Sequence, residues 1–260
     1  MTTSGVVVLG NHPDLAGKTA VVTGGSRGIG AATAIALARN GVDVTVVGRD
    51  QAALDGVAAA ITDTGGRALA AVADCTSATD LDRLHAQVLA RFGKVDIVIA
   101  FAGGYGQPVP SVEETSDHWR HVVDSDLTAT FLTISAFLPE LTAHGGAIVT
   151  MASSAGRQAS RAAAAYSAAK AGVVGMTRHL ANELAPQGVR VNCVAPAAVE
   201  NDRMRSFMSE EQREQLGRGY PLGRLGTPDD IAAATLFLVS AASSWITGIT
   251  LDIAGGSVMP

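Results

Sequence analysis

From Lys18 onward, short runs of β-branched residues alternate with alanine-rich stretches of helical period. This alternation is typical of βαβ units, which pair their strands in parallel and cover both faces of the sheet with helices. The strands predicted in this way are residues 19–23, 43–47, 67–72, 97–100, 147–151, 190–194 and 250–252. Such a series predicts a doubly wound α/β fold, in which ligands bind at the carboxyl ends of the strands.

Length and composition limit the domain organisation. A chain of 260 residues with 47% hydrophobic content supports one large α/β core and is short for two. We therefore expect an N-terminal extension over residues 1–16 and a single domain over residues 17–260. Residues 200–226 are too polar for the core and follow the sixth strand, so they are expected to form a helical lid over the ligand site. An ordinary surface excursion is the alternative.

Charge and hydropathy exclude several kinds of partner. The net charge is −5 and Lys and Arg form no run, which argues against a surface for nucleic acid or anionic lipid. No window approaches the ~20 apolar residues of a membrane span, and no signal peptide is recognisable. Cys75 and Cys193 lack the paired spacing of a metal or redox site. The expectation is a cytoplasmic protein with reduced thiols and no metal.

The first predicted strand runs directly into a glycine-rich turn and a helix, in the sequence TAVVTGGSRGIG. Gly24 permits a tight turn, Gly28 leaves room for a pyrophosphate against the backbone, and Gly30 lets the helix pack on the sheet. The helix, expected over residues 31–39, then directs its free N-terminal amides at the phosphates. The motif predicts a dinucleotide site.

TGxxxGIG resembles the cofactor loop of the short-chain dehydrogenase/reductases, and the likeness extends from Lys18 to Gly256. The resemblance implies a Rossmann-type fold, a nicotinamide cofactor and an oxidoreductase activity. It also implies the cofactor-binding set Gly24, Ser26, Arg27, Gly28, Ile29, Gly30, Arg49, Asp74, Ala102, Gly103, Tyr166, Lys170, Pro196 and Val199.

The residues after the second strand bear on the choice of dinucleotide. NAD enzymes place an acid there to bind the adenosine ribose, whereas this chain has Gly48 followed by Arg49. We expect Arg49 and Arg27 to converge on a 2′-phosphate, so that NADP(H) is preferred over NAD(H). By resemblance, Asp74 meets the adenine amino group.

Tyr166 and Lys170 stand four residues apart in an alanine-rich stretch, so both project from one face of a predicted helix. An ammonium group one turn from a phenol stabilises the phenolate and makes proton transfer feasible near neutrality. Ser153 precedes Tyr166 by thirteen residues, the interval found in the family. The resemblance makes Tyr166 the proton donor to a ketone, Ser153 the group that binds its oxygen, and Lys170 the residue that holds the nicotinamide ribose.

Three departures from the family pattern occur near the predicted site. Residues 100–103 read Ala-Phe-Ala-Gly in place of Asn-Asn-Ala-Gly, and Ala197 and Asn201 stand near a usual glycine and threonine. Asp126 replaces an asparagine that completes a catalytic tetrad through a water chain. An ionised aspartate there can still hold the water of Lys170, but its charge opposes the effect of that lysine on Tyr166. We expect slower or pH-shifted turnover.

The substrate is predicted less sharply than the chemistry. The chain is similar to 3-oxoacyl-carrier-protein reductases, but His144 and Gln187 stand where those enzymes carry arginines. A free small or medium ketone or alcohol is therefore expected. Tyr105, Met204, Phe207 and Met208 are the predicted apolar pocket wall, with ordinary packing as the alternative.

Other classes of function remain as alternatives. The same fold can serve a non-redox dinucleotide-binding regulator, or an elimination or isomerisation enzyme. His118 and His121 lie three residues apart but have no third ligand of plausible spacing, which favours surface or capping roles. Apolar helices over residues 162–183 and 230–240 are compatible with a homo-oligomer, a dimer or a homotetramer.

Overall fold

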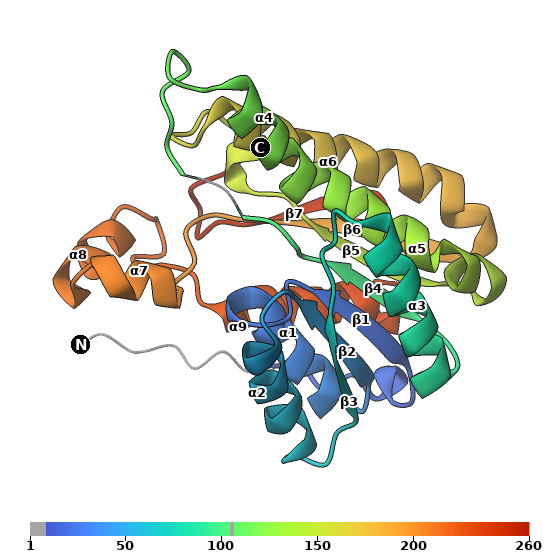
Figure 1. Cartoon of the computed structure of the whole chain (residues 1–260). Helices are drawn as coiled ribbons and strands as arrows, with labels where there is room; N and C mark the ends of the chain where they lie inside the picture. The colour runs from blue at the N-terminus through green and yellow to red at the C-terminus, as the bar shows by residue number, and fades with distance from the viewer. Residues whose placement is uncertain (1–8, 105–106, 260) are drawn as a thin grey trace.

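The computed structural model describes residues 9–104 and 107–259, which form a parallel sheet between two layers of helices (Figure 1). Within these residues the strands are β1 (Thr19–Thr23), β2 (Asp43–Gly48), β3 (Ala68–Val72), β4 (Ile97–Ala100), β5 (Gly146–Met151), β6 (Val189–Pro196) and β7 (Thr250–Ile253). The α-helices are α1 (Gly28–Arg39), α2 (Gln51–Thr62), α3 (Ala78–Phe92), α4 (Ser116–Val123), α5 (Ala129–His144), α6 (Ala164–Leu184), α7 (Asp202–Phe207), α8 (Glu210–Gly217) and α9 (Pro228–Val239).

The strands are ordered β3-β2-β1-β4-β5-β6-β7, and every pair is parallel. The chain direction across the sheet reverses between β1 and β4, and this is the point where open α/β sheets bind ligands. β1 and β4 are fully buried because helices cover both of their faces, which explains their unbroken apolar and β-branched sequences. The predicted doubly wound fold is confirmed.

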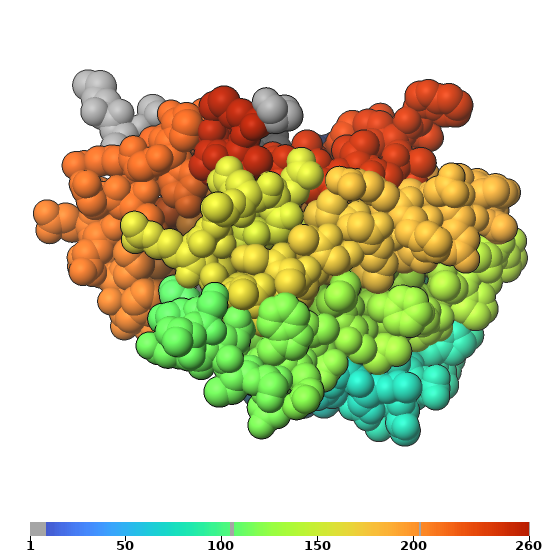
Figure 2. All heavy atoms as spheres, turned by 90° about the horizontal axis from the view of Figure 1, so that it is seen from above, coloured from blue at the N-terminus to red at the C-terminus, as the bar shows by residue number. Residues whose placement is uncertain are grey.

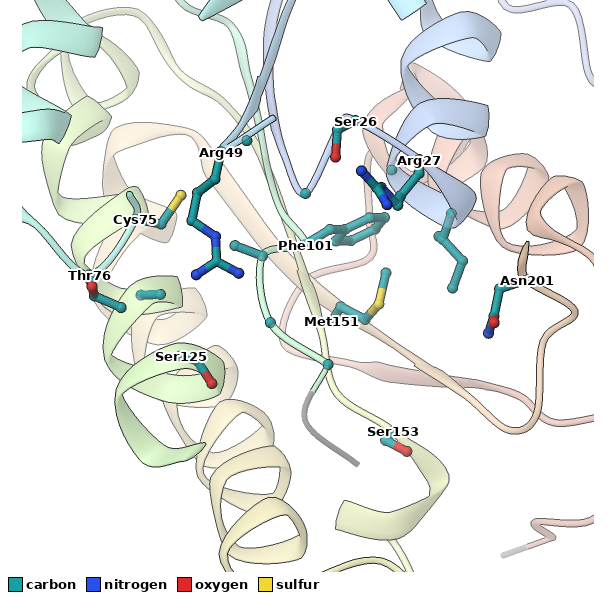
Figure 3. Close-up of a pocket in the computed structure, with 18 of the residues that line it drawn as sticks. Ser26, Arg27, Arg49, Cys75, Thr76, Phe101, Ser125, Met151, Ser153 and Asn201 are labelled. Carbon is teal, nitrogen blue, oxygen red and sulfur yellow. The ribbon is translucent and has the colours of Figure 1, made fainter. Parts of the chain in front are cut away.

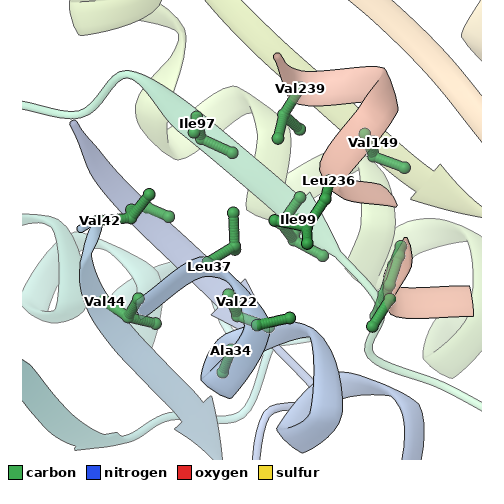
Figure 4. Close-up of a cluster of buried hydrophobic side chains, with 14 of the residues drawn as sticks. Val22, Ala34, Leu37, Val42, Val44, Ile97, Ile99, Val149, Leu236 and Val239 are labelled. Atoms are coloured by element: carbon green, nitrogen blue, oxygen red, sulfur yellow. The ribbon is translucent and has the colours of Figure 1, made fainter. Parts of the chain in front are cut away.

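Two apolar cores hold the layers together. One joins α1, α2 and α9 to one face of the sheet, with Val22, Leu37, Ile99 and Leu236 fully buried within it (Figure 4). The other joins α3, α5 and α6 to the opposite face, around Phe137. Burying a large apolar side chain contributes roughly 1.5–3 kcal/mol, so these two cores keep the sheet and its strand ends in place.

The predicted element boundaries differ from the observed ones in two informative places. Helix α1 begins at Gly28, three residues before the expected start, because glycine is tolerated in a first helical turn although it is a poor former of helix interiors. Strand β6 continues to Pro196, which carries its end into the ligand crevice. The segment 200–226 contains α7 and α8, which project from one end of the molecule beside the C-terminal residues (Figures 1 and 2).

None of the helices in the described ranges is both long and apolar enough to cross a lipid bilayer.

Candidate active site

A cavity of about 1070 Å³ lies at the carboxyl ends of the strands. The loops that follow β1, β2, β3, β4, β5 and β6 all contribute to its wall, as expected for the switch point of the sheet. Of the predicted site residues, the cavity is lined by Gly24, Ser26, Arg27, Ile29, Gly30, Arg49, Asp74, Ala102, Gly103, Ser153, Tyr166, Pro196 and Val199. Gly28, Asp126 and Lys170 lie behind or beside this wall.

The glycine-rich loop has the shape that a dinucleotide needs. Gly24 has a φ of +66°, and a Cβ there would stand 2.6 Å from the carbonyl oxygen of Phe101. Gly28 has a φ of +55° and no atom near the place of its missing Cβ, so the backbone is open to a ligand. Because Gly28 also begins α1, free helix amides face this opening. The cradle fits a pyrophosphate group.

The two arginines predicted to bind a 2′-phosphate both reach the cavity but do not meet. Arg27 donates to Asp50 at 2.6 Å, whereas Arg49 extends toward Cys75 and Thr76 (Figure 3). The partner of Arg27 is therefore Asp50, the residue after Arg49, and convergence of the two arginines on a 2′-phosphate stays a prediction. Both members of that pair are more than half exposed.

Asp74 is held by the residue that lies two positions after it. Its Oδ1 accepts hydrogen bonds from the amide of Thr76 at 2.9 Å and from the hydroxyl of Thr76 at 2.7 Å. These bonds keep the pKa of Asp74 below its ordinary value, although partial burial opposes them. Next to it, burial raises the pKa of Cys75 to about 11, so this thiol is a poor nucleophile.

Ser153 and Tyr166 come from neighbouring elements at the other end of the cavity. Ser153 follows β5 and begins a short turn, where its Oγ accepts from the amide of Ala155 at 3.2 Å. Tyr166 and Lys170 are on α6, as the spacing predicts. Gly156 lets this helix approach the serine turn, since a Cβ there would lie 2.6 Å from the carbonyl carbon of Lys170.

Lys170 is buried behind Tyr166 and its ammonium group is held by two oxygens. Its Nζ lies 3.0 Å from Asp126 Oδ1, donates to the carbonyl of Met151 at 3.1 Å, and stands 5.6 Å from the centre of the Tyr166 ring. Asp126 also accepts from the amide of Gly104 at 2.7 Å and from the hydroxyl of Ser125 at 2.9 Å. The sequence predicted a water between Asp126 and Lys170, but the structure has a direct ion pair.

A local irregularity of the helix explains this contact. Residues Asp124–Thr128 form a π-helical turn between α4 and α5, and such turns reorient side chains at functional sites. Asp126 is fully buried there.

Thr23 takes over part of the role expected of the missing asparagines after β4. Its Oγ1 accepts from the amides of Phe101 and Ala102, at 3.1 and 3.2 Å, and donates to the carbonyl of Ile99 at 3.3 Å. The ends of β1 and β4 are therefore joined by a hydroxyl of the first strand, while Phe101 packs into the core.

The predicted apolar pocket wall is wrong for its helical part. Met204, Phe207 and Met208 do not line the cavity, and Phe207 is 66% exposed; Tyr105 lies outside the described residues. Glu200 and Asn201 line it instead. The carboxylate of Glu200 binds both Arg205 and Arg213 at 3.1 Å, which fixes α7 and α8 to the end of the cavity.

Two residues used to predict the substrate lie far from the cavity, and three that were not predicted line it. His144 and Gln187 lie at the amino-terminal ends of β5 and β6, away from the cavity, so they carry no information on its ligand. Thr76, Ser125 and Met151 line the cavity and had not been predicted, because only their contacts across the fold reveal them. Within the described residues, no three His, Cys, Asp or Glu side chains cluster as metal ligands.

Comparisons with known proteins agree with this geometry. A family model described as enoyl-(acyl carrier protein) reductase matches residues 24–257. The chain is 37% identical to a 3-oxoacyl-[acyl-carrier-protein] reductase of Chlamydia muridarum, over 93% of this chain and 98% of that protein. It is 40% identical to a cyclohexanol dehydrogenase of Rhodococcus sp. (strain TK6), over 93% of this chain and 96% of that protein.

Solved structures give the same result. A short-chain type dehydrogenase/reductase from Mycobacterium marinum superposes with a TM-score of 0.86 at 33% identity, covering 95% of this chain and 98% of that one. Levodione reductase superposes with a TM-score of 0.87 at 30% identity, covering 93% and 97%. With its glycine-rich cradle and the Ser153, Tyr166 and Lys170 grouping, the chain belongs to the short-chain dehydrogenase/reductase family of oxidoreductases.

Proposed function

We propose that this protein interconverts a ketone and a secondary alcohol with NADP(H), and that Tyr166 is its general acid and base. The observation that carries the proposal is the placement of the Ser153 and Tyr166 side chains on the wall of one cavity, with the ion pair of Lys170 and Asp126 buried behind them. This cavity also contains the glycine cradle that fits a dinucleotide.

The chain's own residues bind the substrate oxygen and move one proton. In the reducing direction, the hydroxyl of Tyr166 donates its proton to the carbonyl oxygen while the Ser153 hydroxyl donates a hydrogen bond to it. Lys170, fixed by Asp126 and the Met151 carbonyl, places a positive charge behind Tyr166 and has donor capacity left for a ribose hydroxyl. When bound, the nicotinamide supplies the hydride.

Three features support a preference for NADP(H). Gly48, the last residue of β2, stands where an acid would bind a ribose hydroxyl, and Arg49 and Arg27 reach the cavity nearby. The pair of Arg27 with Asp50 is exposed, so exchanging this partner for a phosphate costs little. The phosphate group then accepts charge-assisted, bidentate hydrogen bonds from the guanidinium of Arg27.

The substrate end supports a neutral ketone or alcohol. Arg205 and Arg213, the cations bound to Glu200 at this end of the cavity, are both committed to its carboxylate. Relatives named for cyclohexanol and levodione act on small ring compounds by their names, which supports a carbonyl of that size. In this proposal, residues 200–226 act as the lid, residues 17–260 are one catalytic domain, and the enzyme works in the cytoplasm as a homo-oligomer.

The test combines binding with turnover. Titration with NADPH and NADH should show tighter binding of NADPH, and a panel of small cyclic and linear ketones should oxidise NADPH with the purified protein. Tyr166→Phe should retain cofactor binding and lose at least ~100-fold in kcat, the usual range for a general acid. Binding without turnover of any carbonyl would instead favour a non-redox role of the same fold.

A further inference from the structure

Glu114 is a buried acid outside the predicted catalytic group, and it contacts the start of the catalytic helix. It precedes Thr115, the residue that caps α4, and its side chain is only 6% exposed. Its two carboxylate oxygens lie 3.4 and 3.3 Å from the amide nitrogen of Ala165. Ala165 is the residue before Tyr166, so Glu114 binds the backbone immediately next to the reacting side chain.

Helix α6 contains no side chain that caps its own first amides. The residue before it is Ala163, which makes no side-chain capping bond, and the first turn contains no acid. The first amides of a helix have no partner within the helix, and a buried unpaired amide is costly. A carboxylate at this end also offsets the positive end of the helix dipole. Glu114, in the segment just before α4, therefore supplies the cap that α6 lacks.

Two further contacts hold Glu114 and the start of α6 in register. His118, in the first turn of α4, places its Nδ1 3.1 Å from Glu114 Oε1. The amide of Ala163 donates to the carbonyl of Gln107 at 3.2 Å. In Figures 1 and 2 the green segment containing α4 lies against the yellow chain that leads into α6. The start of α6 is thus held at the amides of Ala163 and Ala165 by the segment that leads into α4.

We propose that Glu114 is a positioning residue for Tyr166: it caps α6 and, oriented by His118, keeps the tyrosine at the correct distance from Ser153 and the substrate. This rests on the proposed function of Tyr166. Tyr166 lies in the first turn of α6, where an uncapped helix frays. Because proton transfer needs hydrogen-bond distances, fraying at this turn lowers the fraction of competent molecules.

The test compares Glu114→Ala with Glu114→Gln in the full chain. The alanine variant is expected to lower kcat roughly five- to tenfold, the rate equivalent of a lost helix cap, while KM for ketone and cofactor changes less than about twofold. The glutamine variant keeps an acceptor oxygen for the Ala165 amide, and its NH2 group can donate to the unprotonated Nδ1 of a neutral His118, so it should recover most of kcat. Hydrogen exchange over residues 163–168 should accelerate in Glu114→Ala and not in Glu114→Gln.

Asp14→Ala is the matched control, because the Asp14 carboxylate also accepts from a backbone amide of a distant segment, that of Ala241 at 2.7 Å, and Asp14 does not line the cavity. It should reduce stability and leave kcat unchanged. An unchanged kcat in Glu114→Ala, an equal loss in Asp14→Ala, or a failure of glutamine to restore the rate would each overturn the proposal. Hydrogen exchange needs no substrate, so it tests the Glu114 cap separately from the proposed function. A protein that is inactive on every carbonyl but normally protected over residues 163–168 would contradict the proposed function and not the capping contact.

Discussion

The two ends of the cavity each contain an ion pair between an aspartate and a basic residue, and the two pairs differ in burial far more than in length. Arg27 and Asp50 stand 2.6 Å apart with side chains 65% and 51% exposed. Lys170 and Asp126 stand 3.0 Å apart with side chains 4% and 0% exposed. Similar contacts in such different surroundings have different energies, and therefore suit different tasks.

The members of the exposed pair can exchange partners, whereas the members of the buried pair stay together. Water screens Arg27 and Asp50, so either can change partner when a phosphate arrives, at a cost of about 1 kcal/mol or less. Lys170 is almost fully buried, so solvent does not screen its charge, and removing one member of a buried pair typically costs about 3–5 kcal/mol. Under the proposed function, the end with Arg27 and Asp50 adapts to its ligand, whereas the end with Lys170 and Asp126 is preorganised.

Asp126→Ala should give the largest effect, because it removes the ion-pair partner of the buried Lys170 ammonium. The expected loss of unfolding free energy is about 3–5 kcal/mol, measured by denaturant titration. Arg27→Ala is the control at the exposed pair and should cost less than about 1 kcal/mol. Equal losses in the two variants would remove the contrast between the two ends.

Asp126→Asn tests whether the negative charge of Asp126 restrains the effect of Lys170 on Tyr166. Asparagine keeps an acceptor for the Gly104 amide but removes the negative charge beside Lys170. The uncompensated lysine then attracts the negative charge that develops on the Tyr166 oxygen more strongly, so the initial rate of alcohol oxidation near neutral pH should rise. A slower enzyme would contradict the idea that Asp126 restrains Lys170.

At the exposed end, Arg49→Ala should weaken NADPH binding about tenfold, the effect of losing one charge-assisted contact, and leave NADH binding unchanged. Asp50→Asn should strengthen NADPH binding by a smaller factor, because it releases Arg27 from its ion-pair partner. Fluorescence titration with both dinucleotides measures each effect. Equal weakening of NADPH and NADH by Arg49→Ala would mean that this arginine contacts adenine or shapes the pocket and does not read the 2′-phosphate.

The fold was predictable because its signals are local. Each strand is a short β-branched run, and the glycine motif depends on neighbouring residues alone, so the sheet and the cradle followed from the sequence. Tyr166 and Lys170 were also predictable, since helical spacing places them on one face. The start of α1 was missed because the weak helix propensity of Gly28 hid it.

Contacts between distant residues were not predictable. Arg27 meets Asp50 across 23 positions, and Glu114 reaches Ala165 across 51. The direct contact of Asp126 with Lys170 depends on a π-helical turn, for which the sequence offers no simple periodic signal. The prediction of pocket residues on and just after α7 was wrong. The sequence does not show that Glu200 anchors this segment through two arginines.

A third ion pair lies between the two extremes and gives the smallest predicted effect. Arg224 and Asp230 are 43% and 18% exposed, and hydrogen bonds from Arg224 and from Thr227 lower the pKa of Asp230 from 3.8 to about 2, against the opposing effect of burial. Because the folded-state pKa is depressed, this carboxylate stabilises the fold above about pH 4 and loses its contribution as the pH falls toward 2. Screening at Arg224 limits the contribution to about 1 kcal/mol.

Asp230→Asn should therefore be less stable than the natural protein at pH 7, with a difference that shrinks as both are titrated into acid. Glu214→Gln is the control, since Glu214 and Arg218 are 3.5 Å apart and more than half exposed, and its difference should stay near zero throughout. A pH-independent difference for Asp230→Asn would assign the effect to the lost cap on the Thr227 amide and not to charge. A loss of stability as large as that of Asp126→Ala would show that partial exposure weakens an ion pair less than the comparison of the two cavity ends implies.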